Sequence, residues 1–206
     1  LYQSLKVCSQ PTYGSEYIEL YNADPCNAAD IGCYMLATPR ALSGTSDGTF
    51  RFPPGTSIPP LGFISIGGPN SGATFLLNNY CSLPNSNYLI STMDRWYIDN
   101  YDMYVVLYNE TGTPVDVVYW TYQAGQASRW NNSSYNGLYN APTNIPSPSG
   151  CPAVASLAGP STIPSSVVSY AGAQPALGLV IHRVTDGSAT WANDGLPSIN
   201  ACNGVC

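Results

Sequence analysis

Two segments of the chain share one pattern, and that pattern limits the folds open to it. Residues 16–22 read Glu-Tyr-Ile-Glu-Leu-Tyr-Asn, and residues 104–109 read Tyr-Val-Val-Leu-Tyr-Asn. Each ends in Tyr-Asn, and a polar turn and a second apolar run with one aspartate follow, at residues 29–34 and 113–118. Side chains that alternate with period two place one side of a strand on a core and the other toward water. Each unit therefore predicts a β-meander or hairpin.

The same alternation recurs along the chain, and no window shows helical periodicity over three turns. Eighteen prolines and nineteen glycines interrupt the sequence throughout, as a sandwich of short strands requires. The predicted strands are Tyr17–Tyr21, Ile31–Ala37, Thr49–Phe52, Phe63–Gly67, Ala73–Leu77, Tyr104–Tyr108, Val115–Trp120 and Leu179–Val184. The predicted core residues are Ile18, Leu20, Ile64, Ile66, Val105, Leu107, Val117, Leu179 and Ile181. We expect an all-β fold with essentially no long helix.

Residues 121–176 interrupt this rhythm, because they are rich in Asn, Ser, Pro and Gly and contain few apolar runs. A structureless loop of this length is unusual inside a compact domain. The segment is either a long loop excursion packed by its own aromatic residues or an inserted lobe, and Cys151 is a candidate to pin it. Leu179–Val184 returns to the same core, so we expect a single domain over residues 1–206.

Charged residues make up only 9% of the chain, against roughly 25% in an average soluble domain. The net charge is −6, Lys6 is the only lysine, and the arginines are scattered. Nucleic acids and anionic membrane surfaces are both bound through clustered basic residues, so neither is an expected partner. No stretch approaches the ~20 apolar residues of a membrane span, which argues against direct membrane insertion. The chain begins at Leu1 and ends in a loop-like sequence, which predicts a processed piece of a longer secreted protein.

The cysteines favour disulfide bonds in an oxidising compartment over a metal site. Their spacing is wide, no C-x-x-C is present, and His182 is the only histidine, whereas zinc ligands usually come in closely spaced pairs. Cys26–Cys33 and Cys202–Cys206 are close enough to staple local loops, but spacing alone leaves the connectivity open. The chain has seven cysteines, and this odd number leaves one thiol free or paired outside this chain. Disulfide bonds of this kind predict a secreted or cell-surface location. The disulfide candidates are Cys8, Cys26, Cys33, Cys81, Cys151, Cys202 and Cys206.

Two further motifs accompany the strand at residues 16–22, the Asp30 strand and the hairpin at residues 104–118. One is the segment Phe-Arg-Phe-Pro-Pro-Gly-Thr-Ser-Ile-Pro-Pro-Leu-Gly-Phe at residues 50–63. The other is His-Arg-Val-Thr-Asp-Gly at residues 182–187, followed by Trp191. Taken in order, these segments resemble the lamin-tail domain family, in the form found on exported proteins of Bacteroidetes-type bacteria. The match covers most of residues 14–200.

The resemblance implies an immunoglobulin-like β-sandwich and says much less about function. Lamin-tail domains carry no catalytic motif and no cofactor, and in bacteria they are modules of large surface or secreted proteins, beside adhesive repeats or hydrolase domains. The acidity and the cysteines of this chain depart from the nuclear relatives, so chromatin binding is not expected. The implied partners are neighbouring domains of a larger surface protein or other subunits of a surface assembly.

Patterns that suggest catalysis or metal binding have simpler structural interpretations. Gly-Thr-Ser-Asp-Gly at residues 44–48 matches G-x-S-x-G, but a strand follows it where a nucleophile elbow needs a helix. Glu16 and Glu19 offer paired carboxylates, yet Glu19 alternates with Ile18 and Leu20 and is expected to be solvated or to cap a turn. A lone histidine on a strand, His182, favours a surface or edge-strand position.

The aspartates at positions 94, 99 and 102 lack the dense spacing of a calcium loop. No metal site is therefore expected there, and no catalytic residue is expected in the chain.

Aromatic and amide side chains gather at residues 95–104 and 130–135. Flat rings beside hydrogen-bonding groups serve both sugar-binding and protein-binding surfaces, whereas tyrosines also cover core edges in loops. Two functions follow: a non-catalytic structural or interaction module, or a carbohydrate-binding or adhesion domain. The candidate ligand-binding residues are Trp96, Tyr97, Tyr101, Trp130 and Tyr135.

Overall fold

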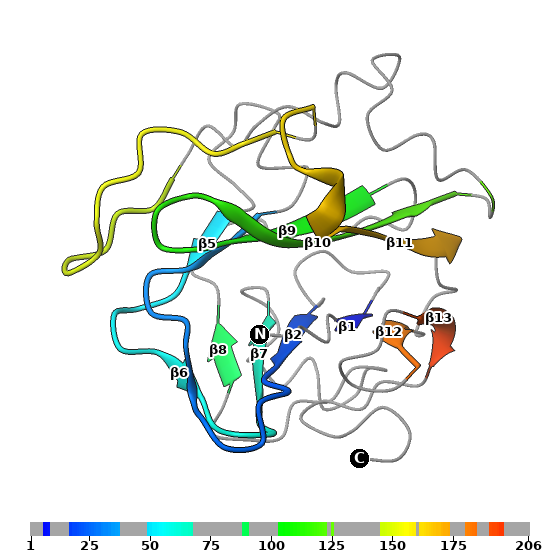
Figure 1. Ribbon diagram of the computed structural model, residues 1–206, viewed down its shortest axis with the longest axis horizontal. Helices are drawn as coiled ribbons and strands as arrows, with labels where there is room; N and C mark the ends of the chain where they lie inside the picture. The colour runs from blue at the N-terminus through cyan, green and yellow to red at the C-terminus, as the bar shows by residue number, and fades with distance from the viewer. Residues whose placement is uncertain are drawn as a thin grey trace.

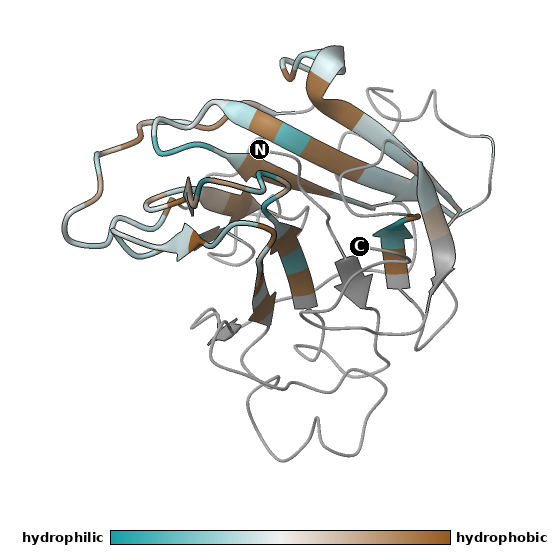
Figure 2. Ribbon diagram, turned by 60° about the horizontal axis from the view of Figure 1, so that its bottom comes forward, coloured by the Kyte–Doolittle hydropathy of each residue, from teal (hydrophilic) through white to brown (hydrophobic). Residues whose placement is uncertain are grey.

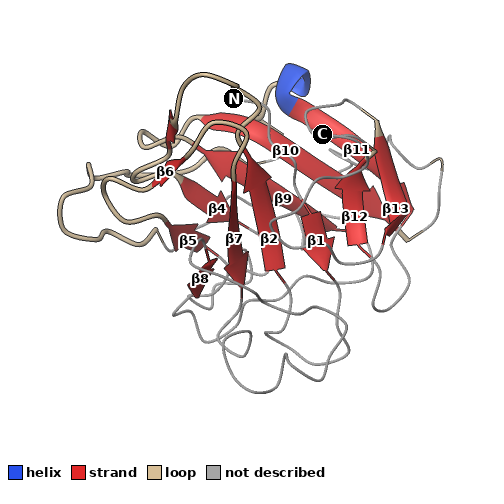
Figure 3. Ribbon diagram, turned by 90° about the horizontal axis from the view of Figure 1, so that it is seen from below, coloured by secondary structure: helices blue, strands red, loops and turns tan. Residues whose placement is uncertain are grey.

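The computed structural model describes residues 6–8, 17–37, 49–67, 88–90, 103–122, 125, 145–159, 161–173, 180–184 and 190–195. These residues form strands in several sheets, and their only helical element is the short 3₁₀ turn η5 (Ser165–Val167) (Figure 3). The expected all-β fold is confirmed. Within these ranges, no helix is long and apolar enough to cross a membrane.

The first sheet has six strands in the order β13-β12-β1-β2-β7-β8. Neighbouring strands are antiparallel except β7 and β8, which are parallel. The first and last parts of the described chain therefore meet, because β1 lies between β2 and β12. The bounds are β1 (Lys6–Cys8), β2 (Tyr17–Tyr21), β7 (Phe63–Gly67), β8 (Tyr88–Ile90), β12 (Val180–Arg183) and β13 (Trp191–Gly195).

The second sheet has five strands in the order β11-β10-β9-β4-β5, and a third sheet pairs only β3 with β6. In the view of Figure 1, the five-stranded sheet lies above the six-stranded sheet, so the two form separate layers. The bounds are β3 (Ala29–Asp30), β4 (Met35–Ala37), β5 (Thr49–Arg51), β6 (Ser57–Ile58), β9 (Met103–Tyr108), β10 (Pro114–Thr121) and β11 (Val168–Ala173).

Most predicted strands are present with nearly the predicted ends, while Ala73–Leu77 lies outside the described residues. The prediction for residues 31–37 is wrong in its first half. The amide of Gly32 donates to Asp30 Oδ1 and the amide of Tyr34 donates to the Ile31 carbonyl, so the chain turns there. Cys33 adopts φ 64°, a left-handed conformation that a strand does not contain, and β4 begins only at Met35.

The prediction that residues 121–176 are loop is wrong at the C-terminal end, where β11 pairs in parallel with β10. The parallel pairing of β10 and β11 requires a crossover connection. Two parallel neighbours need a crossover that carries the chain back to the starting edge of the sheet. Residues 122–167 make that crossover between β10 and β11.

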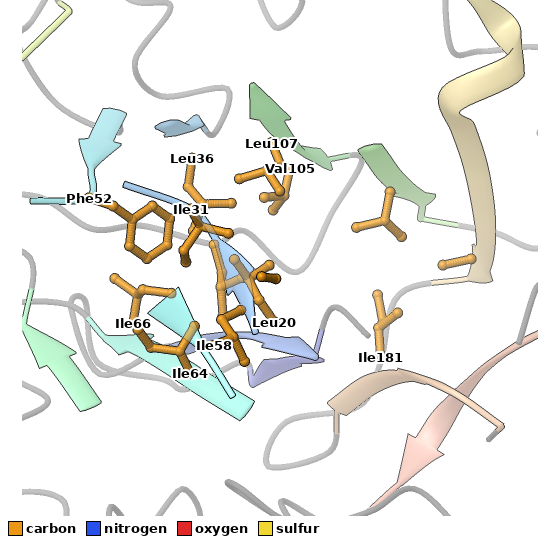
Figure 4. Packing of buried hydrophobic residues seen from close by; sticks show 14 of the residues in the cluster. Leu20, Ile31, Leu36, Phe52, Ile58, Ile64, Ile66, Val105, Leu107 and Ile181 are labelled. Carbon is orange, nitrogen blue, oxygen red and sulfur yellow. The ribbon is translucent and has the colours of Figure 1, made fainter. Parts of the chain in front are cut away.

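One buried cluster is shared by both large sheets. Leu20, Ile66 and Ile181 come from the six-stranded sheet, and Leu107 and Trp120 come from the five-stranded sheet. Figure 4 shows the side chains of Leu20, Ile66, Ile181 and Leu107 converging from both layers, and Figure 2 shows that apolar residues concentrate in the strands. The described members of the predicted core are all buried. Leu179 lies outside the described residues.

A second cluster covers the opposite face of the five-stranded sheet. Tyr104, Val106 and Tyr108 alternate with the residues of the first cluster, and apolar residues of 145–159 and 161–167 pack over them. Val117 belongs to this second cluster. The expectation that one side of each repeated strand faces water is therefore wrong for β9, where every residue from Tyr104 to Tyr108 is at most 2% exposed.

The two Tyr-Asn sequences end their strands in the same way, because each asparagine side chain organises the next turn. Asn22 is 1% exposed, and its Nδ2 donates to the carbonyls of Asn27, Ile58 and Pro59. Asn109 Oδ1 accepts bonds from the amides of Thr111 and Thr113. An asparagine that bonds to nearby backbone stabilises a turn in place of continued strand pairing.

Truncation of Leu107 tests the position of the first cluster. Leu107 is 2% exposed, so Leu107→Ala is expected to lower the free energy of unfolding by ~2–5 kcal/mol, since it leaves a cavity. Urea denaturation measures the change. Leu61→Ala is the matched control, because Leu61 is 53% exposed and its truncation is expected to cost less than about 0.5 kcal/mol. A loss below ~1 kcal/mol at Leu107 would place that side chain outside the core.

Candidate functional site

The predicted ligand-binding residues Trp96, Tyr97, Tyr101, Trp130 and Tyr135 lie outside the described residues. Of the aromatic stretch at residues 95–104, only its last two residues, Met103 and Tyr104, are described. Tyr104 is 1% exposed and belongs to the second cluster. That end of the stretch therefore contributes to packing.

A disulfide joins Cys33 to Cys151 across 118 residues of sequence, with Cα atoms 5.4 Å apart. The considered pairing of Cys33 with Cys26 is therefore wrong, and Cys26 is a free, exposed thiol. The expectation that Cys151 pins the excursion is confirmed. Turn geometry accounts for the choice of partner, since the turn at Cys33 lies against the segment that carries Cys151. The side chains of Cys8, Cys81, Cys202 and Cys206 lie outside the described residues.

Arg51 stands beside this disulfide and is 5% exposed. Its Nε donates to the Cys33 carbonyl at 3.1 Å, and its Nη2 donates to Pro152 at 2.7 Å and Glu110 at 3.3 Å. Its Nη1 donates to the Pro146 carbonyl at 3.1 Å. The guanidinium thus gathers carbonyls from three separate parts of the chain. Burial lowers the pKa of Arg51, but a guanidinium remains charged at neutral pH.

A second polar group joins the two large sheets. Arg183 on β12 approaches Asp116 on β10, with Nη2 3.5 Å from Oδ2. The guanidinium also lies over Trp191 of β13, 4.4 Å from the ring centroid, within the range of a cation–π contact. A register shift in the β9–β10 ladder lies between Pro114 and Asp116. Beyond it, Asp116 shares a face with Val118 and Trp120, the face that looks toward the six-stranded sheet.

Burial governs the protonation of this pair. Desolvation raises the pKa of Asp116 to about 6, and the attraction of Arg183 only partly offsets it. The same cause lowers the pKa of Arg183, although Asp116 acts in the opposite direction. The ion pair therefore does not repay the loss of hydration of its carboxylate, which is common for buried pairs.

Glu19 is not the solvated carboxylate that its position on β2 predicts. It is 0% exposed, as is Ser65, its partner in the register of β2 and β7. Ser65 Oγ donates to Glu19 Oε2 at 3.1 Å. Alternation correctly puts Glu19 on the face opposite Ile18 and Leu20, but alternation does not reveal that this face is also shielded from water. Glu16 lies outside the described residues.

Of the other catalytic and metal candidates, the structure describes only His182. His182 is partly buried on β12, a strand paired on both sides, and its Nδ1 lies 2.9 Å from the Arg183 carbonyl oxygen. The expected edge position of His182 is therefore wrong. In the described part of the chain, no three His, Cys, Asp or Glu side chains are placed to hold a metal ion. Residues 44–48 and the aspartates at 94, 99 and 102 lie outside it.

Arg51, Asp116 and Arg183 were not singled out from the sequence, although a signal was available. Arg51 stands between Phe50 and Phe52, and Asp116 interrupts an apolar run. A charge within a strand whose neighbours are apolar is a candidate for burial with a partner.

The chain matches no protein-family model and no curated protein.

Substitution of Arg51 tests its role in joining segments. Arg51→Lys keeps the charge but removes the planar fork, so several buried carbonyls lose their donor. We expect the free energy of unfolding to fall by roughly 2–4 kcal/mol in urea denaturation. Arg51→Met, which also removes the charge, is expected to cost at least as much. A change within about 0.5 kcal/mol for Arg51→Lys would contradict this role.

The raised pKa of Asp116 predicts an unusual dependence of stability on pH. The folded state holds the proton more tightly than the unfolded state, so the contribution of Asp116 to stability is full below about pH 4 and is lost as pH rises to about 6. The difference is roughly 3 kcal/mol, at 1.36 kcal/mol per pKa unit.

The measurement is the free energy of unfolding from pH 3 to pH 8, at intervals of about half a unit, for the wild-type chain and Asp116→Asn. The difference between the two curves isolates Asp116 from Asp24, whose pKa is lowered by hydrogen bonds from Cys26 and Asn27. We expect that difference to change between about pH 4 and pH 6, and parallel curves would refute a raised pKa.

Proposed function

We propose that this chain is a non-catalytic structural or interaction module of a secreted or cell-surface protein. The observation that supports it most is that buried aromatic and charged side chains pack the core and join segments of the chain. Tyr104, Tyr108 and Tyr119 are buried in the cluster to which residues 145–159 and 161–167 contribute, and Arg51 and Arg183 join distant segments. These groups hold the fold together and are not presented to a substrate.

The architecture proposed for the whole chain is one immunoglobulin-like β-sandwich domain of the lamin-tail type, with bacterial origin implied by the same resemblance. The order of motifs along the sequence supports this assignment. The cluster shared by the five- and six-stranded sheets is also compatible with a sandwich. The proposed partners are neighbouring domains of a larger surface protein or other subunits of a surface assembly.

A location outside the cytoplasm is supported by the Cys33–Cys151 disulfide, since such bonds persist in oxidising compartments. The low content of charged residues is typical of exported proteins and agrees with that location. No cofactor is proposed, and neither nucleic acid nor the membrane interior is proposed as a partner.

The second candidate function is a carbohydrate-binding or adhesion domain. It rests on the sequence between Trp96 and Tyr101 and on Trp130 and Tyr135, where aromatic residues stand among amide and hydroxyl side chains. Rings of this kind bind sugars when they lie exposed beside hydrogen-bonding groups.

Binding and turnover measurements on the intact chain distinguish the proposals. The structural proposal predicts no turnover on a panel of hydrolase substrates and no binding on a glycan array. Glycan binding that is lost in Trp96→Ala or Trp130→Ala would establish the adhesion function instead. Turnover that Glu19→Gln or Ser46→Ala abolishes would show an enzyme. Tyr122→Ala, at an exposed position just after β10, is the aromatic control for both assays.

A further inference from the structure

The segment 145–159, named here the strap, covers the outer face of the five-stranded sheet with few attachments. Figure 1 shows it (yellow) on the side of β9 and β10 away from β2 and β7. Leu157 is its one fully buried residue, and Ile145, Val154 and Ala158 pack partly buried against the second cluster. A cover with so little buried apolar surface gains limited stability from burial.

In the described part of the chain, the backbone amides of the strap donate no hydrogen bond to the sheet. Within the described residues, its backbone–backbone bonds stay inside it or reach Thr162 and Ile163, so no strand ladder ties it to the sheet. Among the described residues, the side chains that donate to the strap are the guanidinium of Arg51, the hydroxyl of Thr162, 3.0 Å from the Gly159 carbonyl, and the hydroxyl of Tyr108, 2.6 Å from the Ala158 carbonyl. The Cys33–Cys151 disulfide is the single covalent anchor described.

The strap also fits closely against the turns beneath it. Gly112 has φ 87°, and a Cβ there would stand 2.8 Å from Val154 Cγ1 and 3.1 Å from Leu157 Cδ2. A Cβ on Gly150 would stand 3.0 Å from Pro54 Cγ. This fit requires the strap to stay close to those turns, and a covalent tether at Cys151, in the middle of the strap, satisfies that requirement.

We propose that the Cys33–Cys151 disulfide is a redox-sensitive clasp, and that its reduction releases the strap and uncovers the outer face of β4, β9 and β10. The first cluster contains no strap residue, so release leaves the packing between the two large sheets in place. The uncovered face carries Met35, Val106, Tyr108 and Tyr119. The device is independent of the proposed function.

The chemistry needs a dithiol reductant. Its thiolate attacks Cys151 Sγ, because Cys151 is partly exposed while Cys33 is 6% exposed. The Sγ–Sγ bond breaks and Cys33 leaves as a thiolate, which takes up a proton. The second thiol of the reductant then displaces Cys151, so the protein gains two electrons and two protons while the dithiol becomes a disulfide.

Hydroxyl-radical footprinting of the full chain, read by mass spectrometry, tests the clasp. The variants are Cys33→Ser with Cys151→Ser, and Cys26→Ser as the control that keeps the disulfide. Labelling of Met35 and Tyr108, which are 0% and 1% exposed, is expected to rise at least about tenfold in the double variant. Cys26→Ser is expected to match the wild-type chain. Trp120 and Phe52, in the first cluster, are expected to stay protected.

Wild-type protein that is reduced in the folded state and then alkylated tests the same release without mutation. Its labelling at Met35 and Tyr108 is expected to match that of the double variant. Unchanged labelling of Met35 and Tyr108 would overturn the proposal, because Arg51 and the apolar contacts would then hold the strap alone. A parallel rise at Trp120 and Phe52, or failure of the double variant to fold, would also overturn it. In either of those cases the disulfide maintains the whole fold and is not a local clasp.

Discussion

Burial of β9 and β10 on both faces is the constraint on which the rest of the structure depends. An antiparallel sheet commonly packs one face and exposes the other, but β9 presents apolar side chains on both sides along its length. The six-stranded sheet covers one face, where Val105 and Leu107 lie. The chain must supply a second cover for Tyr104, Val106 and Tyr108. Residues 145–159 and 161–167 do so, and the long crossover between β10 and β11 is the route by which the chain reaches that face.

The second cover has a different physical character from the first. Strands that pair in a ladder satisfy their own backbone groups, whereas the strap is proline-rich and forms no ladder. Backbone carbonyls near a core need donors, and Arg51 supplies them for Pro146 and Pro152 from a buried position. Asn22 donates in the same way to carbonyls of the loops near the end of β2, and Asn109 Oδ1 accepts from the amides of the turn that follows β9. Polar side chains in this protein thus replace secondary structure where turns and crossovers approach the sheets.

These contrasts explain how much of the fold the sequence predicts. Alternation identifies β2 and β7, because Ile18 and Leu20 lie on one face of the first strand and Ile64 and Ile66 lie on one face of the second. Such an apolar face is buried whatever the topology. The burial of Glu19 could not be predicted, since a single strand carries no information about what covers its other side. The partner of Cys33 could not be predicted either, because 118 residues separate it from Cys151 and Cys26 is closer in sequence. β11 was missed because its sequence, Val-Ser-Tyr-Ala-Gly-Ala, lacks the alternation of a half-exposed strand.

The Asp116–Arg183 pair shows why a buried ion pair is poor evidence for either stability or catalysis. Its carboxylate is costly to ionise, with a pKa raised to about 6 by burial, and a shift of this kind also occurs at catalytic acids. A catalytic acid, however, needs a reacting group within reach. Here the group within reach of Asp116 is Arg183, whose guanidinium is held over Trp191. The contacts of Arg183 with Asp116 and Trp191 hold β10, β12 and β13 in fixed positions relative to one another. The pair therefore helps to position the two sheets, and the raised pKa of Asp116 is the consequence of burying a charge where the sheets meet.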